Sequence, residues 1–157
     1  MQLLAAQPTE GQNMKKPHLV LAIGLLTLFS LNSTGYAQDK SGIIELVSKK
    51  ATEHNVPVAL AQAVISLESN YSTHVTGVRG EYGLGQIRCS TAKMLGMVGK
   101  CDKLNDPETN LEYSMSYLKE GLDISNGDIR QAVNYYASGV AGISKNTRYY
   151  KEIMKRL

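Results

Sequence analysis

Residues 67–87 read LESNYSTHVTGVRGEYGLGQI, and this stretch places a carboxylate, Glu68, where an apolar helix gives way to a glycine-rich loop. Leu60, Val64 and Glu68 are spaced by four residues, so they share one face of a helix. Glu68 therefore continues the buried stripe at the C-terminal end of that helix. We expect partial desolvation and the negative end of the helix dipole to raise the pKa of this carboxyl group.

A glutamic acid that keeps its proton near neutral pH serves as a general acid, and the pattern around Glu68 predicts this function. The alternative is a surface carboxylate at a helix end, which leans into water or pairs with Arg79 or Lys93. The helical stripe alone leaves both interpretations open.

The rest of the sequence after residue 38 predicts a mainly α-helical, single small domain, α+β at most, with a short hairpin within 74–84. Helix start and stop signals predict six helices. The first begins with a cap at Ser41, has the apolar face Ile43, Ile44 and Val47, and ends at the break at 53–57. The others run from Pro57 to about Ser69, from Ser90 to about Gly96, from Asp106-Pro107 through Leu122, from Asp128 through Tyr136, and over about 146–155.

The N-terminal quarter of the sequence has the pattern of an export signal. Met14-Lys15-Lys16 precedes an apolar run over 19–31, and Gly35-Tyr36-Ala37 ends it. We predict a secretory signal peptide over 14–37, cleaved near Ala37, with 1–13 as an extension without assigned function. The apolar run is shorter than the roughly 20 residues that span a bilayer, and an uncleaved anchor is the alternative. Residues 38–157 are then an exported domain, periplasmic or secreted.

The charge of the sequence argues against nucleic-acid binding. The net charge of +3 falls by about one when Lys15, Lys16 and Glu10 are removed with the predicted leader. This excess is too weak and too scattered for a nucleic-acid partner, although it suits a polyanionic wall polymer. No metal ion or cofactor is predicted.

Cys89 and Cys101 are the two cysteines of the chain, and both follow the predicted leader. Cysteines of exported proteins usually pair, so we predict a disulfide between them. It would close a loop of about 13 residues and stabilise the fold by about 3 kcal/mol in the chain-entropy model. A metal site is the alternative, but two cysteines without a nearby histidine pair make a poor zinc motif.

Five short blocks follow one another in a specific order along residues 55–155. They are Glu68-Ser69, Gly83-Leu84-Gly85-Gln86-Ile87, the Asn110-Leu111 to Tyr117-Leu118 segment, Tyr135-Tyr136-Ala137-Ser138-Gly139, and Thr147-Arg148-Tyr149-Tyr150. In this order they resemble the soluble lytic transglycosylase (SLT) domain, a family with a lysozyme-like fold.

The resemblance implies an exported enzyme that cleaves the β-1,4 bond between N-acetylmuramic acid and N-acetylglucosamine of peptidoglycan. By this analogy Glu68 protonates the glycosidic oxygen, then acts as base on the sugar's own 6-hydroxyl group and closes a 1,6-anhydro ring. The predicted substrate-binding residues are Ser69, Gln86, Tyr117, Tyr136 and Tyr150. For the tyrosines the alternative is core packing with the hydroxyl at the surface, and Ser69 has the alternative of bonding only to backbone.

Two residues depart from the family pattern. Gly85 stands where the family has Met, and Ala137 stands where it has an Asn that helps to hold the site. Three functions therefore remain: a lytic transglycosylase, a lysozyme-type hydrolase that uses Glu81 as a second carboxylate, and an inactive wall-binding or assembly module. Small members of the family often serve a secretion or conjugation machine, so such a partner is a further expectation, with the chain as a monomer.

Overall fold

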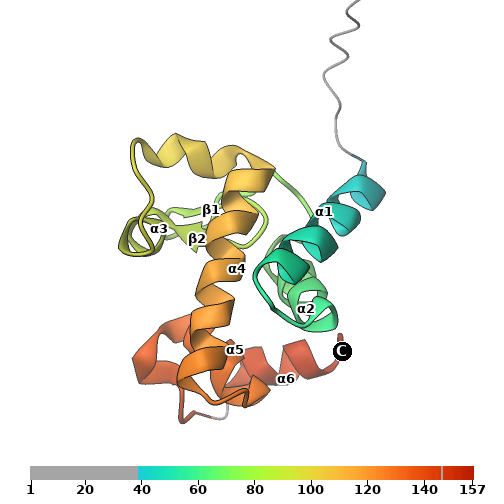
Figure 1. The fold of residues 1–157 in the computed structure, drawn as a ribbon, viewed down its shortest axis with the longest axis vertical. Coiled ribbons are helices and arrows are strands. Elements are labelled where there is room, and N and C mark those ends of the chain that lie inside the picture. The colour runs from blue at the N-terminus through green and yellow to red at the C-terminus, as the bar shows by residue number, and fades with distance from the viewer. Residues whose placement is uncertain (1–38, 146) are drawn as a thin grey trace, which may run out of the picture. The chain divides into compact units, whose positions relative to one another are not determined.

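The computed structural model describes residues 39–145 and 147–157, so the predicted extension (1–13) and signal peptide (14–37) lie outside the described residues. The described residues are mainly helical, as predicted (Figure 1). The α-helices are α1 (Lys40–Glu53), α2 (Val58–Ser69), α3 (Cys89–Met94), α4 (Pro107–Ile124), α5 (Ile129–Ser138) and α6 (Arg148–Met154), with 3₁₀ turns η1 (Cys101–Asn105) and η2 (Val140–Gly142) and strands β1 (Glu81–Tyr82) and β2 (Ile87–Arg88).

Short polar side chains cap four of the helices in the described residues: Asp39 caps α1, Asp106 caps α4, Asp128 caps α5 and Thr147 caps α6. Asp106 caps α4 by accepting from Thr109 N at 2.8 Å, with Pro107 in the first turn, and Asp128 caps α5; both caps are confirmed predictions. The predicted cap of α1 is wrong by two residues. Asp39 accepts from Gly42 N at 2.9 Å, and Ser41 instead donates its hydroxyl to Asp39 at 2.6 Å, because a carboxylate is the stronger acceptor.

The hairpin lies partly beyond its predicted range. Thr76 and Tyr82 form an isolated bridge within 74–84, but the two-stranded ladder pairs Glu81 with Arg88 and Tyr82 with Ile87. Gly83 adopts a positive φ of 56°, which starts the reversal between the two strands. The second strand of the hairpin, β2, therefore begins after the turn at 83–86 and lies outside the predicted range of 74–84.

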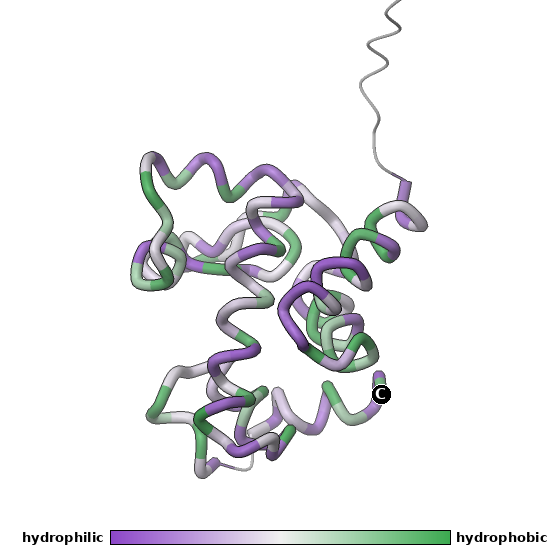
Figure 2. The backbone as a smooth tube through the Cα atoms, in the orientation of Figure 1, coloured by the Kyte–Doolittle hydropathy of each residue, from purple (hydrophilic) through white to green (hydrophobic). Residues whose placement is uncertain are grey.

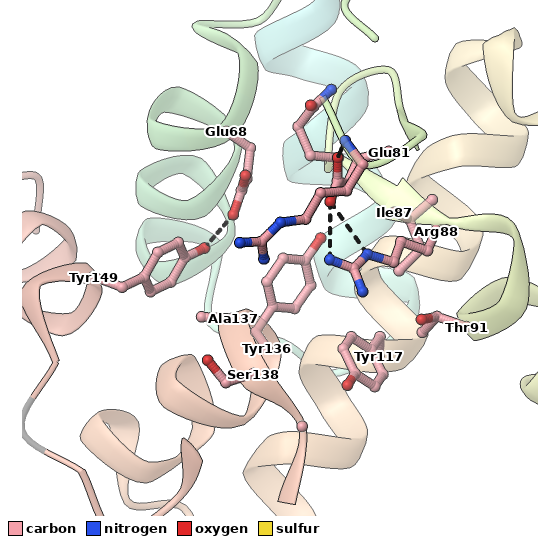
Figure 3. Close-up of a pocket in the computed structure, with 13 residues that line it drawn as sticks. Glu68, Glu81, Ile87, Arg88, Thr91, Tyr117, Tyr136, Ala137, Ser138 and Tyr149 are labelled. Carbon is pink, nitrogen blue, oxygen red and sulfur yellow. Dashed lines mark hydrogen bonds and ion pairs between the residues drawn. The ribbon is translucent and has the colours of Figure 1, made fainter. Parts of the chain in front are cut away.

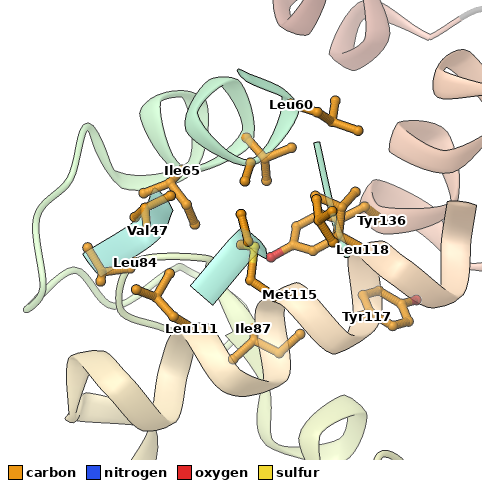
Figure 4. Close-up of a cluster of buried hydrophobic side chains, with 14 of the residues drawn as sticks. Val47, Leu60, Ile65, Leu84, Ile87, Leu111, Met115, Tyr117, Leu118 and Tyr136 are labelled. Carbon is orange, nitrogen blue, oxygen red and sulfur yellow. The ribbon is translucent and has the colours of Figure 1, made fainter. Parts of the chain in front are cut away.

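Helix α4 runs through the middle of the domain, with the hairpin and α3 near its start and α5 near its end (Figure 1). Its buried positions recur at spacings of three and four residues, and α4 packs against α5 and α1. Hydrophobic segments along α1 and α2 appear green in Figure 2. The fully buried centre is shown in Figure 4 and includes Val47, Leu60, Ile65, Leu111, Met115 and Leu118. Ile44, predicted on the buried face of α1, is 38% exposed, because the stripe of that helix follows Ile43, Leu46 and Val47 instead.

The predicted disulfide is present and ties the first residue of α3, Cys89, to the first residue of η1, Cys101, with Cα atoms 5.5 Å apart. It fixes the segment that follows β2 against the turn that precedes α4. In the part of the chain that the structure describes, no helix combines the length and apolar character needed to cross a bilayer.

Candidate active site

Glu68 lies in the last turn of α2, and the chain reverses sharply just after it. Asn70 and Tyr71 both adopt left-handed backbone, with φ of 49° and 66°, which ends the helix. The Tyr71 hydroxyl donates to Gln62 Oε1 at 2.7 Å, and Lys40 Nζ donates to Asn70 Oδ1 at 2.9 Å. Two side-chain contacts therefore hold the helix end that carries the carboxylate.

The Glu68 carboxyl group is half-buried, and its Oε1 accepts a hydrogen bond of 2.6 Å from the Tyr149 hydroxyl group of α6 (Figure 3). Burial raises the pKa of Glu68, the hydrogen bond from Tyr149 acts to lower it, and the negative charge of Glu81 raises it again. The net result is a pKa above the ordinary value, in the direction that favours a proton donor.

Glu68 faces a cavity of about 660 Å³, which lies between α2, the hairpin, the middle of α4, the C-terminal end of α5, and α6. Such a volume suits part of an oligosaccharide or a similar ligand. The residues that line it are Glu68, Arg79, Glu81, Gln86, Ile87, Arg88, Thr91, Tyr117, Tyr136, Ala137, Ser138, Gly139 and Tyr149.

Glu81, the second carboxylate in this cavity, has both oxygen atoms engaged by its neighbours. Its Oε1 accepts from Arg88 Nε at 3.2 Å and Nη2 at 3.0 Å, and its Oε2 accepts from Arg79 N at 2.9 Å (Figure 3). Partial desolvation acts to raise the pKa of Glu81, but the hydrogen bonds and the Arg88 charge outweigh it, so the pKa lies below its ordinary value. The cavity thus holds two carboxyl groups with opposite tendencies: Glu68 favours its protonated form, and Glu81 favours its charged form.

Gln86 lines the cavity, but its amide nitrogen braces the loop. Its Nε2 donates to Val75 O at 3.1 Å and to Gly83 O at 2.9 Å, and its backbone has a positive φ of 48°. Both amide hydrogens are therefore used within the protein, and Oε1 remains as the acceptor for any ligand.

Tyr136 and the Gly85 peptide form one buried unit beside Glu68. The Tyr136 hydroxyl donates to Gly85 O at 2.7 Å, while Gly85 N donates to Asn110 Oδ1 at 2.9 Å. The Asn110 amide also donates to Tyr82 O at 2.7 Å and Leu104 O at 2.9 Å, so this side chain, 1% exposed, has its groups satisfied. Asn110 thereby fixes the hairpin turn to α4.

Tyr117 reaches the cavity with little of its ring surface. It is 9% exposed, and its ring centroid lies 5.0 Å from that of Tyr135 and 5.5 Å from that of Tyr136. The three rings pack mainly against one another, as aromatic clusters in cores do. Tyr117 therefore offers an edge and a hydroxyl group to the cavity instead of an open stacking face.

Ser69 and Tyr150 are absent from the described residues that line the cavity. Ser69 Oγ donates to Ile65 O at 3.3 Å within α2, and Tyr150 N donates to the helix cap, Thr147 Oγ1, at 3.2 Å. Tyr149, which was not among the predicted site residues, lines the cavity and contacts Glu68, whereas Tyr150 was predicted to bind substrate. The signal that separates the two tyrosines is the spacing of four between Tyr149 and the buried Ile153, which places both on the inner face of α6.

Asn134 is a second residue that the sequence analysis missed. It is fully buried in α5, donates its amide to Lys145 O and accepts the hydroxyl of Thr147, the residue that caps α6. These contacts set where α6 begins and so where Tyr149 lies. A buried polar side chain on a helix is the only sequence signal for this role, and it does not identify the partner.

The helical fold, with one half-buried glutamic acid in a cavity beside a small hairpin, defines a protein of the lysozyme-like class. Two solved structures share the fold. Lytic transglycosylase Slt of Pseudomonas aeruginosa, an inactive mutant, matches with a TM-score of 0.59 and 20% identity over 71% of this chain and 20% of that chain. The 70-kDa soluble lytic transglycosylase of Escherichia coli matches with a TM-score of 0.58 and 24% identity over 72% of this chain and 19% of that chain.

The chain belongs to the transglycosylase SLT domain family, whose model matches residues 45–157. A protein of Enterobacteria phage PRD1 named "Transglycosylase" is 28% identical over 116 residues, which are 72% of this chain and 42% of the phage protein. The chain thus spans less than half the length of the phage relative and about a fifth of the two bacterial proteins.

Proposed function

We propose that this domain is a peptidoglycan lytic transglycosylase in which Glu68 is the one catalytic acid and base. The observation that carries the proposal is the contrast between the two carboxylates of the cavity. Glu68 is half-buried with a raised pKa, whereas both oxygen atoms of Glu81 are held by Arg79 N and Arg88. A general acid needs the first environment, and a free second base is not available in the second.

In the proposed mechanism, Glu68 donates its proton to the oxygen that joins N-acetylmuramic acid to N-acetylglucosamine. The bond from that oxygen to C1 breaks, and the 2-acetamido group stabilises the positive charge at C1. The Glu68 carboxylate then accepts the proton of the 6-hydroxyl group as this oxygen bonds to C1. The 1,6-anhydro ring closes without water, Glu68 regains its proton, and the tethered nucleophile benefits from a high effective molarity.

Tyr149 acts as a positioning residue in this mechanism, because its 2.6 Å hydrogen bond orients the Glu68 carboxyl group. This contact supplies a polar group to the site although Ala137 stands where the family pattern has an Asn. In this chain a hydroxyl group from α6 supports the carboxylate. Gln86, Tyr117 and Tyr136 remain the proposed contacts to the sugar, through Oε1 of Gln86 and the exposed edges of the tyrosines.

The proposal includes export, with residues 14–37 as the leader and a periplasmic or secreted monomer that opens the wall locally, for example for a secretion or conjugation machine. Peptidoglycan lies outside the cytoplasmic membrane, so an enzyme that cleaves it has to be exported. N-terminal sequencing of the mature protein tests the leader, and a start at or near Gln38 is expected from the cleavage predicted near Ala37.

Mass spectrometry of muropeptides released from purified sacculi tests the reaction. The wild-type protein should release 1,6-anhydro products, and Glu68→Gln should release none while it keeps its helical circular dichroism spectrum. If Glu68→Gln cleaves as fast as the wild type, Glu68 is not the acid. Products heavier by one water, lost in Glu81→Gln, would instead identify a hydrolase with Glu81 as its second carboxylate.

Ala137 supports a second candidate, an inactive wall-binding module, because the residue lines the cavity and brings no polar group to it. This candidate predicts that wild-type protein sediments with sacculi but releases no fragments at any pH. Release of fragments by the wild type excludes it.

A further inference from the structure

Two arginine side chains, Arg79 and Arg88, share the cavity with Glu68 but have no part in the mechanism above. Arg88 lies on β2, directly opposite Glu81 of β1. Arg79 lies in the turn that leads into β1, which is closed by a hydrogen bond of 2.9 Å from Gly77 N to Glu81 O. Both arginines thus project from the hairpin wall.

Glu81 positions this pair through both of its oxygen atoms. One oxygen receives two guanidinium nitrogens of Arg88, and the other receives the backbone N–H of Arg79. Gly77 leaves the space that this requires, because a Cβ atom at residue 77 would collide with Glu81 Oε2 and lie 2.7 Å from Gln86 Oε1. The carboxylate is therefore packed tightly under the turn and holds the wall in shape.

The charges on this wall do not balance. Glu81 neutralises one arginine, and the Nη1 group of Arg88 is not used by Glu81. Arg79 is exposed and forms no ion pair with the residues described, 39–145 and 147–157. One positive charge and several guanidinium donors therefore remain for a ligand in the cavity.

Guanidinium groups bind carboxylates in a planar, two-point manner, which a neutral sugar ring cannot match. In the polymer of the proposed function the sugar backbone is neutral. Its carboxylates lie on muramic acid, either on the 3-O-lactyl group or on the stem peptide attached to that group. We propose that Arg79 and Arg88 form a carboxylate-binding wall that recognises this substituent, so that the substrate class is glycan with charged muramic acid. The inference rests on the proposed function.

Binding measured without cleavage tests this proposal. The full exported chain carrying Glu68→Gln is sedimented with three polymers: intact sacculi, sacculi freed of stem peptides by an amidase, and the amidase-treated glycan with its lactyl carboxylates converted to neutral methylamides. We expect Arg79→Gln to lower the ratio of charged-polymer to neutral-polymer affinity about threefold to tenfold. Arg79→Lys should keep part of the ratio, and Arg130→Gln, an exposed arginine of α5 away from the cavity, is the matched control.

Arg88→Gln serves as the second variant. Because it removes the hydrogen bonds from Arg88 to Glu81 across the hairpin, circular dichroism is used to verify that the domain stays folded. In intact sacculi the lactyl carboxyl group is bound in the amide to the stem peptide, and the amidase frees it. A lower ratio on the amidase-treated glycan alone therefore assigns the lactyl carboxylate, and a lower ratio on intact sacculi alone assigns the stem peptide. A lower ratio on both polymers shows that the wall binds either carboxylate. An unchanged ratio in both arginine variants overturns the proposal. Failure of the proposed function is a separate result, namely wild-type protein that binds these polymers but releases no anhydro products.

Discussion

The hydroxyl group of Tyr149 donates a hydrogen bond of 2.6 Å to Oε1 of Glu68, and the two residues are 81 positions apart in the sequence. The contact joins the last helix, α6, to the end of α2. Asn134 supports it from α5 by accepting the Thr147 hydroxyl at the cap of α6. The environment of the carboxylate therefore depends on the final residues of the domain.

Replacing Tyr149 by Phe should lower the rate of glycan cleavage about tenfold or more, because a hydrogen bond to an ionisable carboxyl group contributes about 1.5–3 kcal/mol. The hydrogen bond acts to lower the pKa of Glu68, so its loss raises that pKa further. The basic limb of the pH–rate profile should then move to higher pH. Rates of muropeptide release across a pH series measure both effects.

Tyr150→Phe is the matched comparison, because Tyr150 is the neighbouring residue and lies off the cavity wall. We expect a smaller loss of rate than in Tyr149→Phe and no displacement of the pH profile. Equal losses in the two variants would mean that Tyr149 acts only through the packing of α6.

Glu68→Gln should stabilise the domain at neutral pH while it abolishes cleavage. Burial raises the pKa of Glu68 above its ordinary 4.5, so the folded state binds this proton more tightly than the unfolded state. The stability contribution is complete below pH 4.5 and is lost as pH rises through the folded pKa. At neutral pH the variant avoids this loss, and its melting temperature should exceed that of the wild type by about 2–6 °C.

Thermal unfolding of both proteins between pH 3 and pH 8 checks this prediction. The two melting temperatures should approach each other at the acidic end, where both side chains are uncharged. A difference that stays constant across the whole range would show that the side chain acts by shape and not by charge.

The parts of this fold that local chemistry determines follow from the sequence. The Asp106-Pro107 and Asp128 starts need only neighbouring residues, since a cap acts within three positions. The spacing of Glu68 with Leu60 and Val64 likewise places the carboxyl group on the core side of α2. The hairpin register could not be predicted, because it depends on a turn in which Gly83 and Gln86 both take positive φ.

Other features of the site depend on residues that are far apart in the sequence. The choice between Tyr149 and Tyr150 depends on how α6 packs on α2, and the amide of Gln86 is turned to Val75 O and Gly83 O by the folded loop. A short motif names residue types but does not fix which of two adjacent tyrosines points inward. For that reason the motif named Tyr150, whereas Tyr149 is the tyrosine of this block that lines the cavity.

Loss of the disulfide should lower the free energy of unfolding by about 3 kcal/mol, through the freedom that the unfolded chain gains. The Cys89→Ala, Cys101→Ala double variant tests this in urea titrations. Arg88 and Thr91 flank Cys89 and line the cavity, so binding to sacculi should weaken together with stability. In a reducing agent the urea midpoint of the wild type should fall towards that of the double variant, and the midpoint of the double variant should not change. An unchanged midpoint in the double variant would contradict the prediction.

Gly85 and Ser114 should behave as a coupled pair, since the side chain of Ser114 fills the space that a side chain at residue 85 would need. A Cβ atom on Gly85 would collide with Ser114 Oγ and lie 2.6 Å from Ser114 Cβ and 2.8 Å from the Tyr136 hydroxyl. Gly85→Ala should therefore cost about 1–3 kcal/mol of stability. Gly85→Met, the residue of the family pattern, should cost more, because its longer chain has to displace Tyr136 from Gly85 O.

Ser114→Gly opens that space, although glycine within α4 costs about 1 kcal/mol by itself. Urea unfolding of Gly85→Ala, Ser114→Gly and the double variant forms a thermodynamic cycle in which the double variant should be more stable than the sum of the two single changes predicts. The coupling has a physical origin in the positions of the two Cβ atoms, so it should persist when Tyr136→Phe removes the third partner. Strictly additive losses of stability would mean that the turn relaxes away from α4, and that Ser114 is not the reason why residue 85 has to be glycine.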